Sequence, residues 1–264
     1  MTPHAMALAL AVAGCASALH EPRPVAALAP GRAQGRSAGE LVRAADAAWA
    51  RRGQPGQAAL AEGMYVDAAA ADERRVEGLL GAMRALSFRI EHDPRAARGE
   101  LARQEVELGQ WCQRRDPGSA ECDYRLAIAL GQQARERTST GQDALGKIVA
   151  LLRRAIARAP ALESAGPHRV LAMVLLRAPS WPIGPGDPEA ALDEAREAVR
   201  RFPDAADNQL ALADALAAND QRSAAHAAYA QALALARRAR ETGELEAPRW
   251  ITEAEAGLER TVEP

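Results

Sequence analysis

The chain has 264 residues, of which 48% are hydrophobic, only 3% aromatic and 26% charged, with a formal net charge of −2 and a pI near 6.3. This balance gives no reason to expect nucleic acid or an anionic membrane surface as a partner. No apolar run reaches the ~20 residues that a membrane-spanning helix needs, so the sequence predicts no transmembrane segment.

The N-terminal residues resemble the export signal of a bacterial lipoprotein. Residues 5–13 form an apolar stretch of the length found in signal-peptide cores. Val12-Ala13-Gly14-Cys15 then follows the lipobox pattern of a branched residue, two small residues and the cysteine that receives lipid. The sequence therefore predicts a signal peptide over residues 1–14 and lipidation at Cys15. Because residues 1–4 carry no Lys or Arg, an alanine-rich N-terminal helix is the alternative.

Residues 15–38 are predicted to be a flexible tether. Between residues 16 and 37 the chain is rich in proline, glycine, alanine and arginine, and it shows no helical or strand periodicity. Ser17 stands where many lipoproteins of the inner membrane carry aspartate, so the lipoprotein resemblance implies the periplasmic face of the outer membrane. The rest of the chain, residues 39–264, is predicted to be a helical repeat domain.

Beyond the tether the apolar residues follow helical spacing, and no segment alternates as a strand does. Asp187-Pro188-Glu189 marks one helix start with an N-cap, a proline in the first turn and an early carboxylate. We expect five antiparallel helix pairs followed by a cap helix. The expected helices span residues 40–52, 58–71, 74–91, 96–115, 120–137, 143–159, 167–177, 188–201, 205–218, 223–240 and 248–259.

A fixed offset of 34 residues identifies the architecture of these pairs, because 34 is the period of the tetratricopeptide (TPR) repeat. Small residues at the recurring positions let antiparallel helices approach closely, and larger residues fill the remaining space. The sequence thus predicts an all-α fold, a right-handed TPR-like solenoid of about five pairs with a C-terminal cap helix. The positions that recur at this offset are Ala191 and Ala225, Ala195 and Tyr229, and Ala198 and Ala232.

The loop within the fourth pair is longer than a minimal repeat needs. Between Arg177 and Pro188 a proline recurs at every third position, a spacing that would align the prolines on one face of a polyproline II turn. One interpretation is a rigid loop that Trp181 anchors on the helix ends. The other is a lip over a ligand groove, because long insertions in a short-loop architecture are often functional.

Residues 111–232 resemble the T-component proteins of TRAP transporters. The resemblance implies an exported, non-enzymatic TPR lipoprotein that docks a periplasmic solute-binding protein or carries a small organic or hydrophobic ligand. The residues that carry it are Ala165-Gly166-Pro167-His168-Arg169, Leu171-Ala172 and the proline-rich loop that ends in Gly186-Asp187-Pro188.

These residues define a candidate binding site on the concave face, since inner-helix side chains of a solenoid line one continuous groove. We expect Gly166, Pro167, His168 and Arg169 to lie in this groove, with Trp181 at its rim. Arg169 would then bind a carboxylate through two parallel hydrogen bonds. The alternative is that His168 and Arg169 cap and pack the start of their helix.

No residue pattern predicts catalysis, a cofactor or a metal. The histidines have no second ligand at the i+3 or i+4 position, which argues against a metal site. The sequence also lacks the nucleophile elbow, the zinc-protease motif and the phosphate-binding glycine loop. Trp49, Trp111 and Trp250 are interpreted as core residues.

Cys112 and Cys122 flank a turn that contains Pro117. In an antiparallel hairpin these positions face each other at disulfide range, and an oxidising compartment such as the periplasm would favour the bond. Two buried thiols are the alternative, because Cys112 occupies the small-residue position that Ala155 and Ala198 take in other pairs.

Two functions remain open at this point. The first is the TRAP-type adaptor that docks a solute-binding protein or carries a ligand. The second is a scaffold at the outer membrane that organises an envelope assembly, such as a secretion or pilus machine, by protein–protein contacts. Assembly of several copies of the chain is compatible with either.

Overall fold

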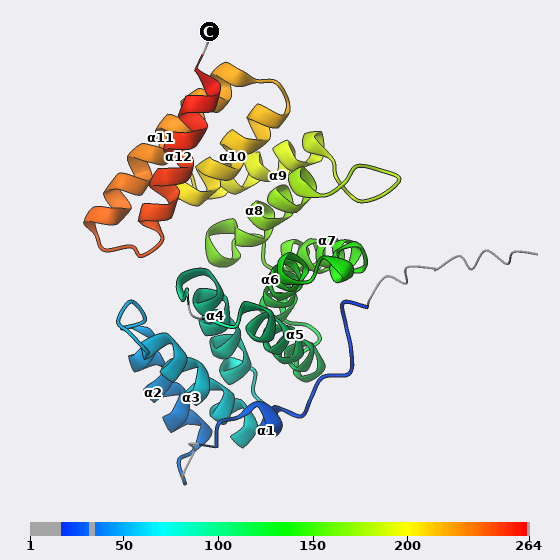
Figure 1. Ribbon diagram of the computed structural model, residues 1–264, viewed down its shortest axis with the longest axis vertical. Coiled ribbons are helices and arrows are strands. Elements are labelled where there is room, and N and C mark those ends of the chain that lie inside the picture. Colours follow the sequence, from blue (N-terminus) through cyan, green and yellow to red (C-terminus); the bar gives the residue numbers. More distant parts are fainter. Residues whose placement is uncertain (1–16, 32–34, 95, 263–264) are drawn as a thin grey trace, which may run out of the picture.

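The computed structural model describes residues 17–31, 35–94 and 96–262, and within them it contains helices and no named strand (Figure 1). Five antiparallel helix pairs and a terminal helix confirm the predicted all-α solenoid. A short helix precedes the first pair, and a 3₁₀ turn, Thr138–Thr140, lies inside the third. The helices are α1 Val25–Leu28, α2 Ala38–Trp49, α3 Gln57–Ala71, α4 Glu77–His92, α5 Arg98–Arg115, α6 Ala120–Glu136, α7 Gly141–Arg158, α8 Leu162–Arg177, α9 Pro188–Arg201, α10 Ala206–Ala218, α11 Arg222–Glu241 and α12 Ala247–Thr261.

Side-chain caps fix where several helices begin. Ser37 accepts a hydrogen bond from the backbone N–H of Glu40, and the Glu40 carboxylate accepts one from the Ser37 N–H, which makes a capping box at α2. Asp187 caps α9, with Pro188 in the first turn as the sequence predicts. Such caps satisfy N–H groups that the helix itself leaves without acceptors.

The helices form two layers. The first helices of successive pairs contact one another in the order α2, α4, α6, α8, α10 and α12, and form the inner layer of the curved molecule. The second helices, α3, α5, α7, α9 and α11, pack against their own partners and form the outer layer. The residues that recur at the 34-residue offset in α9 and α11 are all buried, which confirms their predicted packing role. Among the described helices, none has the length and apolarity that crossing a bilayer requires.

Near each end of the solenoid, a tyrosine ring packs on a glycine of the neighbouring helix. Tyr229 of α11 lies against Gly257 of α12, where an added Cβ would stand 2.3 Å from the tyrosine ring. The Tyr229 hydroxyl donates to Asp214 and accepts from Arg260. Burial raises the pKa of Tyr229 to about 12, and the bond to Asp214 acts in the same direction. The tyrosine is therefore a neutral donor that joins three helices.

The matching arrangement lies near the N-terminal end. The Tyr65 hydroxyl donates to Asp46 at 2.5 Å and accepts from Arg84 at 3.3 Å, and a Cβ added at Gly81 would lie 2.5 Å from the ring. Burial and the Asp46 bond likewise raise the pKa of Tyr65 to about 12. The first and last units are thus packed in the same way, with a tyrosine ring lying against a helix at a glycine, where no side chain separates them.

This close contact gives a direct prediction. Gly257→Ala and Gly81→Ala each place a methyl group inside the van der Waals radius of a buried tyrosine ring, so each should lower the free energy of unfolding by about 1–3 kcal/mol. Urea denaturation followed by circular dichroism measures the loss. Gly146→Ala is the matched control, because a Cβ there meets no other atom within 4 Å and the substitution favours the helix. Unchanged stability in both tyrosine-contact variants would contradict the packing described.

The N-terminal segment differs from the predicted tether. Residues 17–31 lie along the outer layer, where α1 contacts α3 and α5. Ala18 is buried, and its N–H donates to Asp143 of α7 at 2.7 Å. The indole of Trp111 donates to the Arg23 carbonyl at 2.8 Å, and the Arg23 guanidinium donates to Glu107. We call residues 17–31 the strap. Helix side chains hold its backbone, although the strap sequence has no periodicity of its own.

Candidate functional site

Helix α8 starts with a left-handed turn that the sequence did not predict. Glu163, Ser164 and Ala165 have φ angles of 45°, 56° and 63°, a conformation that costs residues other than glycine roughly 1–2 kcal/mol each. Gly166 follows and packs closely against α6, the preceding inner helix, since an added Cβ would lie 2.4 Å from the Tyr124 hydroxyl oxygen. Regular helical geometry begins after this turn, in agreement with the predicted helix start at 167.

Side chains from α8 and α10 hold the turn in place. Asn208 donates its amide to the Ser164 carbonyl at 3.0 Å and accepts from Arg169 Nη1 at 2.8 Å. Arg169 Nη2 also lies 3.2 Å from Asp207 Oδ2. The Arg169 guanidinium therefore pairs inside the protein, and its side chain is largely buried. This arrangement corresponds to the packing alternative for Arg169.

The other predicted members of the site are buried in the same joint. Gly166, Pro167 and His168 are buried, and His168 Nδ1 lies 2.6 Å from Glu194 Oε2 on α9. On the opposite side of the turn, Arg125 of α6 pairs with Glu163. The motif that carries the TRAP resemblance is thus the joint at which the third, fourth and fifth pairs meet.

Trp181 lies apart from this joint. The motif stands at the beginning of α8 and the loop leaves its end, and the eight-residue step from Arg169 to Arg177 spans about 12 Å of helix. The Trp181 side chain is 86% exposed. The loop is ordered by hydrogen bonds such as Gly186 N–H to the Pro179 carbonyl at 2.9 Å. The structure therefore does not bring Trp181 together with residues 166–169, and Trp181 does not anchor the loop on the helix ends.

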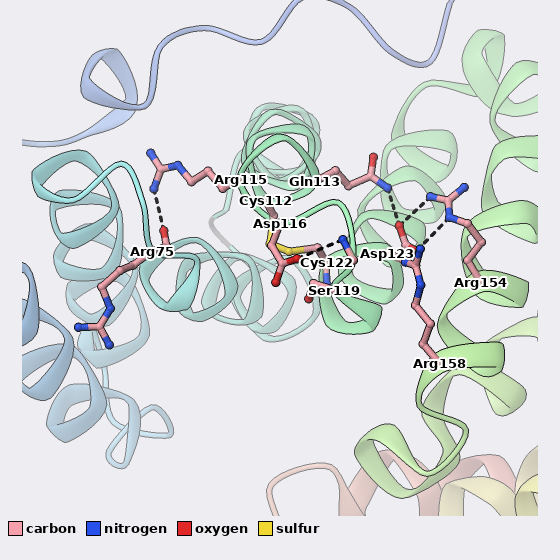
Figure 2. The surroundings of a disulfide bond; sticks show 11 residues. Arg75, Cys112, Gln113, Arg115, Asp116, Ser119, Cys122, Asp123, Arg154 and Arg158 are labelled. Carbon is pink, nitrogen blue, oxygen red and sulfur yellow. Dashed lines mark hydrogen bonds and ion pairs between the residues drawn. A yellow bond between two sulfur atoms is a disulfide. The ribbon is translucent and has the colours of Figure 1, made fainter.

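Cys112 and Cys122 are joined by a disulfide that links α5 to α6, with Cα atoms 5.4 Å apart (Figure 2). Both cysteines are fully buried. Ser119 accepts a hydrogen bond from the Cys122 N–H and caps α6, and Asp116 accepts one from the Gly118 N–H in the turn. The short turn and its caps place the cysteines opposite each other.

We expect reduction of this disulfide to lower the free energy of unfolding by about 2–3 kcal/mol, because a loop of this size restricts the unfolded chain by that amount in the chain-entropy model. Urea denaturation with and without reductant measures the difference. Cys112→Ala with Cys122→Ala should reproduce the reduced protein and should not respond to reductant. Mass spectrometry of non-reduced peptides from protein isolated under thiol-trapping conditions tests whether the bond forms in the cell, and two freely alkylated thiols would contradict it.

The remaining tryptophans occupy packed positions. Trp49 meets the Phe88 ring edge-on at 5.6 Å, Trp111 packs under the strap, and Trp250 lies against the C-terminal core. Within the described parts of the chain, no three or more His, Cys, Asp or Glu side chains gather in a way that could hold a metal ion. The lipid attachment site, Cys15, lies outside the described residues.

No sequence pattern indicates that the two ends of the solenoid meet. The loop before α12 reaches the first unit, where a Cβ added at Gly53 would stand 3.2 Å from Leu245 Cδ2. Next to it, His92 Nε2 at the end of α4 lies 2.5 Å from Glu246 Oε1. The loop between α2 and α3 and the loop before α12 approach each other at the left of Figure 1. Residues 154 positions apart therefore close the curved molecule.

A cavity of about 650 Å³ lies at this meeting point. The Arg52 guanidinium sits 4.8 Å from the Trp49 ring centroid and forms no ion pair with a described residue. Phe88 and His92 stack at 4.2 Å and form the aromatic wall. Asp93 belongs to the lining as well, and Arg89 pairs with Glu62 and His92 with Glu246. Arg52 is therefore the guanidinium left to bind a carboxylate of a partner that also carries apolar groups. The lining includes Arg52, Phe88, Arg89, His92 and Leu245.

Comparisons with known proteins support the fold. No protein-family model and no curated protein matches the chain. Among solved structures, TTC0263, a thermophilic TPR protein of Thermus thermophilus, is similar with a TM-score of 0.59 and 19% identity, over 83% of this chain and 100% of that one. The MamA protein is similar with a TM-score of 0.50 and 18% identity, over 79% and 97%. At these identities the similarity establishes a TPR-type fold.

Proposed function

We propose that this protein is a non-enzymatic adaptor that binds another protein, and that it is exported and anchored by lipid at Cys15 to the periplasmic face of the outer membrane. The observation that carries the binding role is the cavity between the first unit and the loop before α12. Because the two ends of the solenoid meet, residues from both ends line this cavity. The TPR-type fold supports the same role, because solenoids of this kind provide extended binding surfaces.

The partner we propose is a periplasmic solute-binding protein, on the resemblance to TRAP T-components, with a small organic ligand as a further candidate. A scaffold for an envelope assembly is the competing function. The cavity favours neither by itself, so the identity of the captured protein decides between them. Residues 166–169, which carry the resemblance, would act by shaping the joint, because the side chains of Arg169 and His168 are engaged within the protein.

A charge reversal in the cavity tests the binding role. Arg52→Glu should abolish cross-linking of the proposed solute-binding protein to the chain, because Arg52 lines the cavity without an acidic partner among the described residues. Arg51→Glu is the matched control, since Arg51 is the exposed neighbour on the same turn and does not line the cavity. Circular dichroism establishes that both variants are folded. Equal cross-linking of the Arg52→Glu and Arg51→Glu variants would show that the binding surface lies elsewhere. Capture of secretion or pilus components in place of a solute-binding protein would favour the scaffold function.

Membrane fractionation tests the anchor separately. Wild-type protein should sediment with outer membranes and carry lipid on its N-terminal peptide, whereas Cys15→Ala should remain unprocessed or become soluble in the periplasm. Wild-type protein that is soluble and free of lipid would show that the lipobox interpretation is wrong.

A further inference from the structure

The loop between α8 and α9 presents two large apolar side chains to solvent. Trp181 is 86% exposed and Ile183 is 66% exposed. We call residues 179–186 the Trp181 knob. It carries no charged residue. An exposed pair of this size on an ordered loop marks a contact surface, unlike single apolar residues scattered over a protein.

The knob has few backbone donors left for water. Three of its eight residues are prolines, which lack an N–H. Ile183 and Gly184 donate to the Ser180 carbonyl at 3.0 and 3.2 Å, and Gly186 donates to the Pro179 carbonyl. Three of the five N–H groups in the knob are therefore satisfied internally, which lowers the cost of moving its apolar tip out of water and suits a lipid interface. Tryptophan also prefers that interface, because its ring is apolar and its N–H is polar.

The chain reaches the knob's edge of the molecule from its N-terminus as well. The turn between α6 and α7 and the knob between α8 and α9 are equivalent loops of neighbouring pairs. Ala18 is fixed to Asp143 at the start of α7, and the described end of the strap and the knob both lie at the right of Figure 1. Only three residue steps separate Ala18 from Cys15, at most about 11 Å of chain. Lipid on Cys15 would therefore hold the knob's edge near the bilayer.

Cationic side chains flank the knob on this edge. Arg137 follows α6 and Arg177 ends α8; both are exposed, and neither forms an ion pair with a described residue. Of the nearby acids, Asp143 binds the strap and Asp187 caps α9, while Glu136 and Glu189 are exposed. Because two exposed acids balance the two exposed arginines, the apolar contact would supply most of the attraction to the bilayer.

We propose that the Trp181 knob inserts into the interfacial region of a phospholipid bilayer and forms a second membrane contact beside the lipid on Cys15. This proposal rests on the anchor in the proposed function. Two contacts on one edge would orient the solenoid. The loop between α2 and α3 and the loop before α12, which line the cavity, lie at the opposite side of Figure 1, so the cavity would then face away from the membrane toward a soluble partner.

Quenching by brominated phospholipids tests the insertion. Purified full-length protein, with Cys112 and Cys122 held in their disulfide, is coupled through the Cys15 thiol to a maleimide-headgroup lipid. The vesicles contain phosphatidylethanolamine and phosphatidylglycerol with brominated acyl chains. We expect bromine to quench part of the wild-type tryptophan emission and this part to disappear in Trp181→Phe. Trp250→Phe is the matched control and should retain it, because Trp250 lies in the C-terminal core.

Equal quenching in wild type and Trp181→Phe would overturn the proposal. A second result would also overturn it. If wild type shows no bromine quenching and the Trp181→Ser, Ile183→Ser double variant loses a protein that cross-links to wild type, the knob docks a protein and not a bilayer. The maleimide coupling does not depend on lipidation in the cell. Failure of the proposed anchor therefore leaves this experiment valid, and failure of insertion leaves the fractionation result unaffected.

Discussion

Glu105→Gln is expected to stabilise the protein at neutral pH and to remove part of the dependence of its stability on pH. Glu105 of α5 is fully buried, and its Oε1 accepts a hydrogen bond from Ser87 at 2.6 Å. Its second carboxyl oxygen has no hydrogen-bond partner among the described residues. Burial raises the pKa of Glu105 from 4.5 to about 8, and the opposing effects of Ser87 and Arg125 do not cancel that rise. At pH 7 the folded protein therefore holds this carboxyl protonated.

The sign of the pH effect follows from where the proton is bound. Between pH 4.5 and 8 the unfolded chain has released the proton and the native state retains it, so stability falls as pH rises through this window. The slope is about 1.4 kcal/mol per pH unit, and above the folded pKa the loss levels off. Glutamine keeps the shape and the acceptor for Ser87 without a proton to lose. We expect a gain of about 2–3 kcal/mol at pH 7 and little change at pH 4.

Urea denaturation of wild type and Glu105→Gln at a series of pH values measures this difference. Glu136→Gln is the matched control, because the same chemical change is made on an exposed side chain and should alter stability by less than about 0.5 kcal/mol. Parallel stability curves for wild type and Glu105→Gln would show that Glu105 is ionised in the folded protein.

Asp123→Ala should cause a large loss of stability, because one buried carboxylate accepts hydrogen bonds from three side chains. Asp123 of α6 is 2% exposed, and its two oxygens accept hydrogen bonds from Gln113 of α5 and from Arg154 and Arg158 of α7 (Figure 2). The bonds to Asp123 raise the pKa of Arg154, as expected for a guanidinium beside a buried carboxylate. One side chain thus joins three consecutive helices.

Removing the carboxylate leaves the Gln113 amide and the two guanidinium groups without their acceptor. Because the arginines are partly exposed and can regain water, the expected cost is about 2–4 kcal/mol in the free energy of unfolding. Denaturation under non-reducing conditions keeps the nearby disulfide constant. Glu121→Ala on the same helix turn is the control and should cost less than about 1 kcal/mol. A similar cost for both substitutions would mean that the Asp123 network contributes nothing specific.

The helix pairs could be predicted because their signal is local and repeated. Ala191 and Ala225, 34 residues apart, occupy equivalent buried positions, and Asp187 with Pro188 begins α9 at the expected residue. Helical periodicity and caps depend on residues within a few positions of one another, so they can be predicted from the sequence. The opposed placement of Cys112 and Cys122 follows from the same local geometry, a short turn between antiparallel helices.

The candidate site required the tertiary structure. Residues 166–169 could be identified as a motif, but only the fold shows that Asn208 and Glu194 engage the side chains of Arg169 and His168. Trp181 belongs to the same stretch of sequence, yet the length of α8 separates it from that joint.

The sequence by itself determined the all-α repeat architecture, because the residues that specify the helices, caps and small-residue contacts of each unit lie within that unit. The tertiary structure alone decided which distant segments meet. The strap is ordered by Asp143, and the cavity exists because Leu245 reaches Gly53. The second of these contacts depends on the summed curvature of five units. Small rotations at each interface accumulate along a solenoid, so closure of the two ends is a property of the whole array that no local pattern encodes.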